Sequence, residues 1–163
     1  MGDTILQQDA EAIGVALGRI PSGCSILTVT SDDVSTGVLV SWVQQAAFEP
    51  PSISVCIKKG RPVGDLIRSS RRFLLNIIGE DTAPMFKHFG RGFSLEEDAF
   101  GGLNTQPTDY GPLLLDCVAQ LGCQLVHETP VGDHDIFIAQ TVAGIVREDA
   151  KPYVHLRKSG LSY

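Results

Sequence analysis

The sequence predicts a mainly β protein, an antiparallel barrel with a few short helices packed outside it. Several segments alternate apolar and polar side chains, which is the pattern of a half-buried strand, and turn residues separate these segments. No β-then-α rhythm repeats along the chain, so a parallel sheet is not indicated. With 163 residues, 43% of them hydrophobic, the chain can bury a core without disulfide or metal staples. We therefore expect residues 1–163 to form a single domain.

The first third of the chain predicts a helix followed by three strands. Apolar side chains recur at helical intervals over residues 7–20 and the pattern stops at Pro21, so this segment is expected to be an amphipathic helix. Strands are expected at 23–30, 34–43 and 52–58, and the last of these alternates most clearly. Prolines at 50 and 51 cannot donate to a strand ladder, so a polar stretch with a break is expected before the third strand.

The middle of the chain mixes helix, strand and loop. A helix is expected over 61–70, a buried strand over 73–78 and a second short helix over 81–89. Glycines, prolines and acidic residues dominate 90–112, which predicts a long loop that covers a site.

The last third predicts a hairpin of two long strands around a turn at 129–133. The second strand is expected at 134–146. In the first, side chains with odd numbers form an apolar face: Leu115, Cys117, Ala119, Leu121, Cys123 and Leu125. The opposite face is expected to meet solvent and carries Asp116, Gln120, Gln124 and Glu128.

Composition and charge exclude several classes of protein. The net charge of −6 argues against nonspecific binding to nucleic acid, which requires clustered cations. No apolar run is long enough to span a membrane and the first twelve residues do not have the order of a secretory signal, so we expect a cytoplasmic protein. The four cysteines match no zinc or CxxC spacing, and we expect them to pack as small apolar residues, with no metal site.

Common catalytic signatures are missing. The sequence has no GxGxxG or P-loop motif for a nucleotide, no GxSxG elbow and no HExxH. The four histidines are far apart in the chain. Hydrolytic chemistry therefore has little support.

Four stretches would suit an anionic aromatic ligand, although each has an ordinary structural alternative. Residues 37–45 run from a strand into hydroxyl and amide side chains, which can hold a phosphate or the edge of a flavin ring or can simply form a polar loop. Lys58, Lys59 and Arg61 precede a helix that starts near Pro62, a combination that favours phosphate but is also typical of a solvated turn. His134 stands at a hairpin tip, either near a ligand or on the surface. The basic, aromatic segment 153–163 is either functional or a frayed tail.

Taken in order, these stretches resemble the flavin reductase family of FMN-binding split barrels. They are most similar to the flavin reductase domains associated with flavodiiron proteins of photosynthetic bacteria. The resemblance covers nearly the whole chain and implies an antiparallel split barrel of Greek-key type. The matching segments are residues 18–23, 41–46 with the prolines at 50 and 51, 73–77, 87–89, 132–134 and 155–160 with Tyr163.

The resemblance also implies a set of flavin-binding residues. The flavin ring and phosphate would contact Ser35, Gly37, Val38, Leu39, Ser41, Trp42, Gln44, Cys56, Lys58, Lys59 and Arg61. The family commonly has a small polar residue after that arginine, whereas Pro62 and Val63 follow here. The remaining members of the set are His88, Phe89 and His134 beside the ring face, and His155, Arg157 and Tyr163 closing the pocket.

The function implied is transfer of a hydride from NADH or NADPH to FMN, with FAD as a possible flavin. The flavin does the redox chemistry, so binding residues are expected rather than a catalytic triad, and His134 is the one expected catalytic residue, in contact with the donor site. Expected partners are a second copy in a homodimer and a flavodiiron or rubredoxin-like acceptor. Two alternatives stay open: an FMN-binding electron carrier without NAD(P)H oxidation, and a ligand-free barrel that serves as an interaction module.

Overall fold

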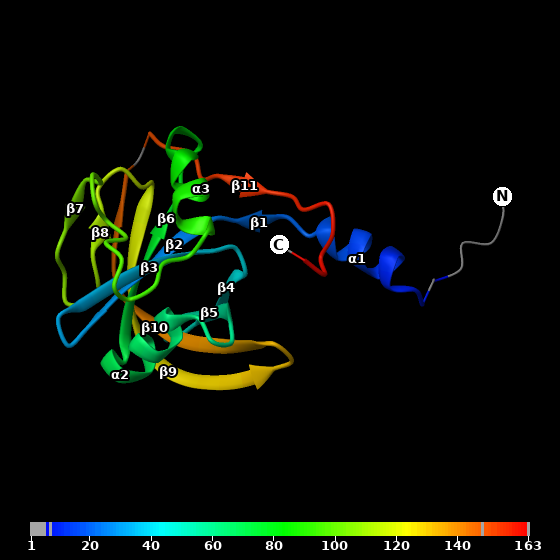
Figure 1. The fold of residues 1–163 in the computed structure, drawn as a ribbon, viewed down its shortest axis with the longest axis horizontal. Helices are drawn as coiled ribbons and strands as arrows, with labels where there is room; N and C mark the ends of the chain where they lie inside the picture. The colour runs from blue at the N-terminus through cyan, green and yellow to red at the C-terminus, as the bar shows by residue number, and fades with distance from the viewer. Residues whose placement is uncertain (1–5, 7, 148, 163) are drawn as a thin grey trace.

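The computed structural model describes residues 6, 8–147 and 149–162, and its main feature is a seven-stranded antiparallel sheet (Figure 1). The strands lie in the order β3-β2-β6-β9-β10-β5-β4, so β3 and β4 form the two edges although they are consecutive in the chain. The seven strands are β2 (Ser25–Ser31), β3 (Val34–Val40), β4 (Val43–Phe48), β5 (Pro51–Lys58), β6 (Arg72–Ile77), β9 (Ala119–Val131) and β10 (His134–Val146). The mainly β, antiparallel fold predicted from the sequence is therefore confirmed.

The sheet is open between β3 and β4, and this opening is the split of the barrel. Only Ser41 and Trp42 separate the two strands in the chain. Each edge strand is paired on one side, β3 with β2 and β4 with β5. The backbone N–H of Cys56 on β5 donates to the carbonyl oxygen of Trp42 at 3.0 Å. The ends of β3 and β5 therefore border the same opening.

Two hairpins follow their sequence signals closely. Asp32 and Asp33 connect β2 to β3, and both have positive φ angles, 48° and 64°, as a tight two-residue hairpin turn requires. The second turn is shorter than the expected 129–133, because residues 129–131 of β9 pair with β10 and only Gly132, with φ of 56°, and Asp133 connect β9 to β10. The second long strand was expected at 134–146, and β10 has these bounds.

The core has two parts. The first lies inside the sheet under α2 (Pro62–Ser70), where Val63 and Ile67 meet the strand residues Val55, Phe73 and Phe137. The second lies under α3 (Pro84–Gly90) and includes Cys24, Ile26, Ile78, Met85, Phe89, Phe93, Ala99, Leu114 and Cys117. The loop at 90–112, which was expected to cover a site, contributes Phe93 and Ala99 to this second core.

Buried Asn76 on β6 fastens the end of that loop to the sheet. Its side-chain Nδ2 donates to the carbonyl oxygen of Ile26 at 3.2 Å and to Oγ1 of Thr28 at 3.1 Å. Its Oδ1 accepts from the backbone N–H of Leu114 at 2.9 Å. Leu114 belongs to β8 (Leu113–Leu114), which pairs with β7 (Thr105–Gln106).

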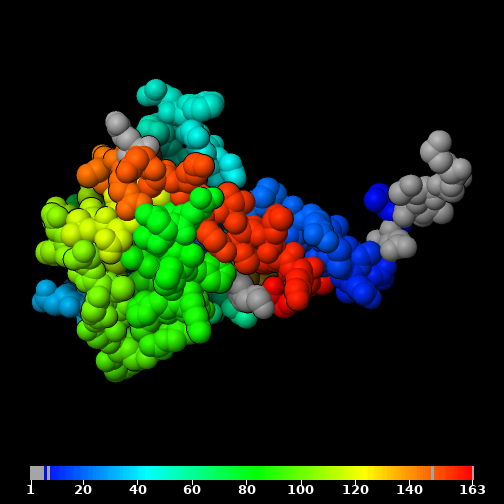
Figure 2. Space-filling view, turned by 90° about the horizontal axis from the view of Figure 1, so that it is seen from above, coloured from blue at the N-terminus to red at the C-terminus, as the bar shows by residue number. Residues whose placement is uncertain are grey.

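The N-terminal helix α1 (Ala10–Gly18) projects from the body of the molecule together with the C-terminal segment (Figures 1 and 2). Asp9 caps it by accepting from the backbone N–H of Ala12 at 2.8 Å. Two short strands, β1 (Ser22–Gly23) and β11 (Val154–His155), connect this arm to the body. The expected helix of residues 7–20 is thus shorter, and residue 7 lies outside the described residues.

The expected apolar face of this helix does not pack on the core. Ile13, Leu17 and Ile20 are exposed, and the buried positions of α1 are Gly14 and Gly18. A Cβ at Gly18 would lie 2.5 Å from the carbonyl oxygen of Arg157. The helix is therefore held by close backbone contact with the C-terminal segment, which the periodicity of its side chains could not indicate.

Two strand predictions are corrected. The strand expected at 34–43 ends at Val40, and the polar stretch after it forms the edge strand β4, which ends in a hairpin at the prolines. The first long strand begins at Ala119, and Gln120 does not face solvent. Its Nε2 donates to the carbonyl oxygen of Leu114 at 2.8 Å, which satisfies the buried amide.

The remaining elements are short. The predicted helix 81–89 is a 3-10 turn, η1 (Glu80–Thr82), followed by α3. Within the described residues, every helix is too short or too polar to cross a membrane.

Candidate flavin-binding site

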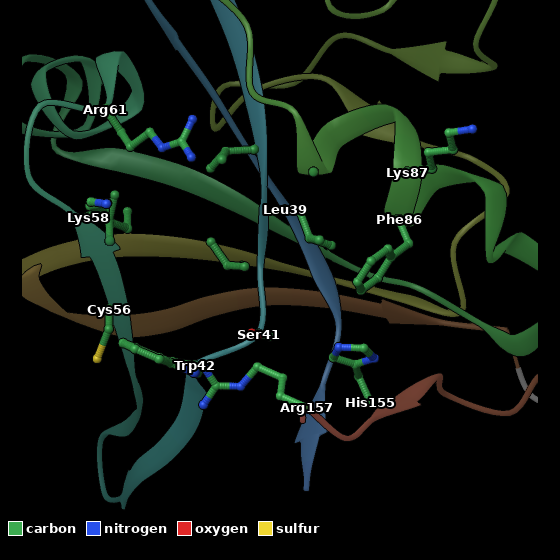
Figure 3. A pocket seen from close by; sticks show the side chains of 14 residues that line it. Leu39, Ser41, Trp42, Cys56, Lys58, Arg61, Phe86, Lys87, His155 and Arg157 are labelled. Carbon is green, nitrogen blue, oxygen red and sulfur yellow. The ribbon is translucent and has the colours of Figure 1, made fainter. Parts of the chain in front are cut away.

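A pocket of about 420 Å³ lies at the opening between β3 and β4 (Figure 3). Its walls come from the end of β3, from β5, from α3 and from the C-terminal segment. The lining residues are Val38, Leu39, Val40, Ser41, Trp42, Cys56, Ile57, Lys58, Arg61, Phe86, Lys87, Gly90, His155 and Arg157. Segments that are far apart in the sequence, from Val38 to Arg157, therefore complete one pocket.

Aromatic rings form part of this wall. The rings of Phe86 on α3 and His155 on β11 lie 5.0 Å apart between centroids. The guanidinium carbon of Arg157 lies 5.0 Å from the centroid of the Trp42 ring, a distance at which a cation is attracted to the ring face. These contacts connect the C-terminal segment to α3 and to the junction of the edge strands.

The pocket is positively charged. Lys58, Arg61, Lys87 and Arg157 line it, and its described lining contains no aspartate or glutamate. Lys58 and Arg61 lie on one side of the pocket, and Phe86 and His155 lie on the other (Figure 3). This arrangement suits an elongated ligand that is anionic at one end and aromatic at the other.

The pocket arginine Arg61 differs from the three described arginines that form ion pairs. Its guanidinium has no hydrogen bond or ion pair with any described residue. By contrast Arg68, Arg91 and Arg147 are each paired with a carboxylate, at 2.9 Å to Asp135, 2.9 Å to Glu97 and 2.6 Å to Asp81 respectively. Because a guanidinium carries five N–H donors, Arg61 retains its whole capacity for an anion.

Neighbouring lysines of the basic turn have different roles. Lys58 lines the pocket, whereas Lys59 does not. The Nζ of Lys59 donates to the carbonyl oxygen of Gly132 at 2.6 Å, and its backbone N–H donates to the carbonyl oxygen of Asp133 at 3.0 Å. Lys59 therefore fastens the β9–β10 hairpin to the end of β5.

The residues of α3 that line the pocket are not the ones that were expected to contact the ligand. Phe86, Lys87 and Gly90 line it, but His88 and Phe89 do not. The Nε2 of His88 lies 2.9 Å from the carbonyl oxygen of Ala99, so it donates there, and Phe89 is fully buried in the second core. Successive residues of a helix are rotated by about 100°, so the face that brings Phe86 and Gly90 to the pocket directs Phe89 into the core.

His134 lies next to the pocket without lining it. Its ring is stacked at an angle on Trp42, with centroids 4.8 Å apart, and only 8% of the residue is exposed. Its Nδ1 lies 2.8 Å from Oδ1 of Asp133. This hydrogen bond is the main reason that the pKa of the Asp133 carboxyl is lowered from its ordinary value. His134 therefore touches the site through Trp42.

Several other expected residues lie away from this pocket. Ser35 and Thr30 share a hydrogen bond between their hydroxyls at 2.7 Å. A Cβ at Gly37 would be 2.9 Å from Cε1 of Phe89, so that glycine leaves room for the buried ring. Gln44 lines a separate groove beyond Trp42. Tyr163 lies outside the described residues.

Sequence reasoning did not select five of the pocket residues. Those are Val40, Ile57, Phe86, Lys87 and Gly90. For α3 a usable signal existed, because Met85 and Phe89 are four residues apart and mark the buried face. Phe86 and Gly90, also four apart, then fall together on the next face.

Cys56 also lines the pocket, and it is the least buried of the four free cysteines. Burial raises the pKa of its thiol. The other three are buried in the core, as predicted. Among the described residues, no three histidine, cysteine or carboxylate side chains are grouped to hold a metal ion.

Comparison with known proteins defines the class to which this fold and pocket belong. Residues 17–160 match the family described as flavin reductase like domain. The chain therefore belongs to the flavin reductase-like family, as its resemblance implied.

By sequence the chain is similar to flavoproteins of Nostoc and Synechocystis. A putative diflavin flavoprotein A 3 of Nostoc sp. (strain PCC 7120) is 38% identical over 151 residues, which cover 91% of this chain and 26% of that protein. Diflavin flavoprotein A 1 of Synechocystis sp. (strain PCC 6803) is 36% identical, with the same shares covered. The chain thus spans about a quarter of the length of these relatives.

Solved structures support the fold. An NADH:FAD oxidoreductase of Streptomyces globisporus superposes with a TM-score of 0.83 at 17% identity, covering 98% of this chain and 95% of that one. An FMN-binding protein of Thermus thermophilus gives a TM-score of 0.72 at 20% identity, covering 91% and 81%. At these identities the likeness establishes the shared architecture.

Proposed function

We propose that this protein binds FMN in the pocket at the β3–β4 opening and transfers a hydride to it from NADH or NADPH. One observation carries the proposal: the pocket of this flavin reductase-like domain joins aromatic walls to four cationic side chains, and its described lining contains no aspartate or glutamate. The fit to a flavin phosphate rests on Arg61, whose donors have no partner among the described residues. The proposal includes a cytoplasmic location and residues 1–163 acting as one unit.

The protein's own contribution is binding and orientation. The flavin, when bound, supplies the hydride-accepting centre. Lys58 and Arg61 hold its phosphate, while Trp42 and Phe86 exclude water from the ring. Lys87 and Arg157 bring positive charge that favours the reduced, more negative ligand. The other expected contacts, from Val38, Leu39, Ser41, Cys56 and His155, belong to the same wall.

His134 acts in this proposal as a positioning residue. It packs on the Trp42 ring and is fixed by Asp133. We therefore expect it to orient the tryptophan beside the donor site, without itself exchanging a proton with the ligand. Ser35, Gly37, Gln44, Lys59, His88 and Phe89, which were also expected to contact flavin, do not line this pocket.

The adjacent lysines of β5 provide the binding test. Dissociation constants for FMN and for riboflavin, which lacks the phosphate, would be measured by quenching of flavin fluorescence. Lys58→Ala should lower the affinity for FMN about tenfold, as expected for loss of a charge-assisted contact. The affinity for riboflavin should not change. Lys59→Ala is the matched control, and it should change neither of the two dissociation constants by more than about twofold. A wild-type protein that binds no flavin at micromolar concentration would refute the proposal.

Hydride transfer needs a separate experiment. FMN-loaded protein would be mixed anaerobically with NADH or NADPH in a stopped-flow spectrometer. Rapid bleaching of the flavin absorbance by either nucleotide is the expected result, and the faster one identifies the donor. Tight FMN binding without bleaching would instead identify an electron carrier. Replacing FMN by FAD in the same measurement compares the two flavins.

Two partners complete the proposal. The exposed apolar residues of the projecting arm, among them Ile13, Leu17 and Ile20 of the helical part and Leu156 and Leu161 of the C-terminal part, suit a homodimer interface. Sedimentation equilibrium should report a dimer that Ile20→Glu weakens. The electron acceptor is proposed to be a flavodiiron or rubredoxin-like protein, since the relatives are longer flavoproteins.

A further inference from the structure

The loop that follows α3 approaches Arg61, at the proposed phosphate end of the pocket, at Gly92. This glycine has a φ of 75°, a left-handed conformation that residues with a Cβ adopt at a cost. A Cβ placed on it would be 2.4 Å from Nη1 of Arg61. The guanidinium therefore rests directly against the backbone of this residue, in space that any side chain at position 92 would occupy.

Arg61 needs such a support because little else fixes its side chain. It is the N-cap residue of α2, and its side chain makes no cap hydrogen bond. Its guanidinium also has no hydrogen bond or ion pair to a described residue. A long side chain without partners ordinarily samples many rotamers, and ordering it costs free energy when a ligand binds.

The backbone at Gly92 is itself well held. Its N–H donates to the carbonyl oxygen of Phe89 at 3.2 Å, where α3 ends. The next residue, Phe93, is buried in the second core, with its ring centroid 5.8 Å from that of Phe89. The guanidinium of Arg61 therefore rests on a part of the loop that is anchored by core packing.

We propose that Gly92 is a positioning residue that seats the Arg61 guanidinium at the pocket rim, and that this seat makes the site selective for phosphorylated flavin over riboflavin. The inference rests on the proposed function and adds a residue from outside the pocket lining. The seat orders Arg61 before the ligand arrives, so the benefit goes to the phosphate and not to the isoalloxazine ring.

Gly92→Ala is the direct test, and Gly102→Ala is its matched control. Gly102 lies in the same loop with a φ of 78°, and a Cβ on it would meet no atom within 4 Å. Both substitutions thus impose similar backbone strain, but only the first intrudes on Arg61. Gly92→Ala should lower the affinity for FMN about tenfold to a hundredfold, which is the range for lost hydrogen bonds to a charged group. Riboflavin affinity should stay within about twofold in both variants.

Arg61 variants keep the inference testable if Gly92→Ala does not fold. Arg61→Lys retains the charge but lacks the planar group that lies on Gly92, so it should lose most of the preference for FMN over riboflavin. In a folded Arg61→Ala background, Gly92→Ala should have no further effect on FMN. An unchanged FMN preference in Arg61→Lys, or equal losses from Gly92→Ala and Gly102→Ala, would overturn the inference. Absence of any flavin binding by wild-type protein is the separate result that removes the proposed function itself.

Discussion

The guanidinium carbon of Arg157 lies 5.0 Å from the centroid of the Trp42 ring, which joins the C-terminal segment to the junction of the two edge strands. The backbone of Arg157 is fixed at the same time, because its N–H donates to the carbonyl oxygen of Gly18 at 3.2 Å. The pocket wall therefore depends on contacts among α1, the C-terminal segment and the edge-strand junction.

The first prediction concerns that contact. Arg157→Ala should lower the affinity for FMN about twofold to thirtyfold, which corresponds to the loss of about 0.5–2 kcal/mol for a cation on an aromatic face. Trp42→Ala should weaken FMN at least as much, because it also removes a wall of the pocket. Arg72→Ala serves as control, since this exposed arginine at the start of β6 is not a pocket residue. Flavin fluorescence titration measures all three, and an effect of Arg72→Ala equal to that of Arg157→Ala would contradict the assignment.

The second prediction uses Cys56 as a reporter of pocket occupancy. Burial raises the pKa values of Cys24 to about 11 and of Cys117 and Cys123 to about 12, so these thiols stay protonated at pH 8. The pKa of Cys56 is raised as well, but its side chain is partly exposed in the pocket. Thiolates are the species that react with iodoacetamide.

Mass spectrometry after limited alkylation should therefore find Cys56 modified first, and saturating FMN should slow its modification. Cys56→Ser provides the control, because it should remove the fast-reacting site and leave the other three cysteines unmodified over the same time. Equal alkylation of Cys56 with and without FMN would show that the flavin occupies a different place.

The strands and their alternation were predictable because local pattern determines them. Ile53, Val55 and Ile57 alternate with polar neighbours and are all buried in β5. The edge strand β4 was missed for the opposite reason, since its backbone pairs on one side only and its side chains are mostly exposed. A strand without a buried face leaves no apolar period in the sequence.

Pocket residues at strand ends were predictable from the sequence. Those that depend on tertiary contacts were less predictable. The family resemblance selected Ser41, Trp42 and Arg61, which the structure brings together. It could not separate Lys58 from Lys59, because the carbonyl oxygen that accepts from Lys59 is on a hairpin 73 residues further along the chain. It did name His155 and Arg157 of the C-terminal segment, and both line the pocket, but it did not select Phe86, Lys87 and Gly90 of α3.

The third prediction concerns the buried amide of Asn76. Asn76→Ala would leave the N–H of Leu114 and the carbonyl of Ile26 without this partner, and each unsatisfied buried group costs about 1–3 kcal/mol. We expect the free energy of unfolding to fall by about 2–4 kcal/mol in urea denaturation. Asn104→Ala, at an exposed position of the loop, should change it by less than about 0.5 kcal/mol. Equal stabilities of the two variants would show that the buried amide of Asn76 does not stabilise the fold.

The last prediction is a pH dependence at the β9–β10 hairpin. The hydrogen bond from His134 is the largest cause that lowers the pKa of the Asp133 carboxyl below its ordinary value of 3.8. A lowered pKa in the folded state means that the stabilisation is present above the unfolded pKa, near 3.8, and is lost as the pH falls through the folded value.

A ¹³C NMR titration of the Asp133 carboxyl should therefore give a midpoint below 3.8 in the wild type. In His134→Ala the midpoint should rise toward the ordinary value, because the hydrogen bond is gone. His127→Ala, at an exposed position of β9, should leave the midpoint where it is in the wild type. A midpoint that does not respond to His134→Ala would mean that this histidine is not held by Asp133, and its role in orienting Trp42 would then lack its anchor.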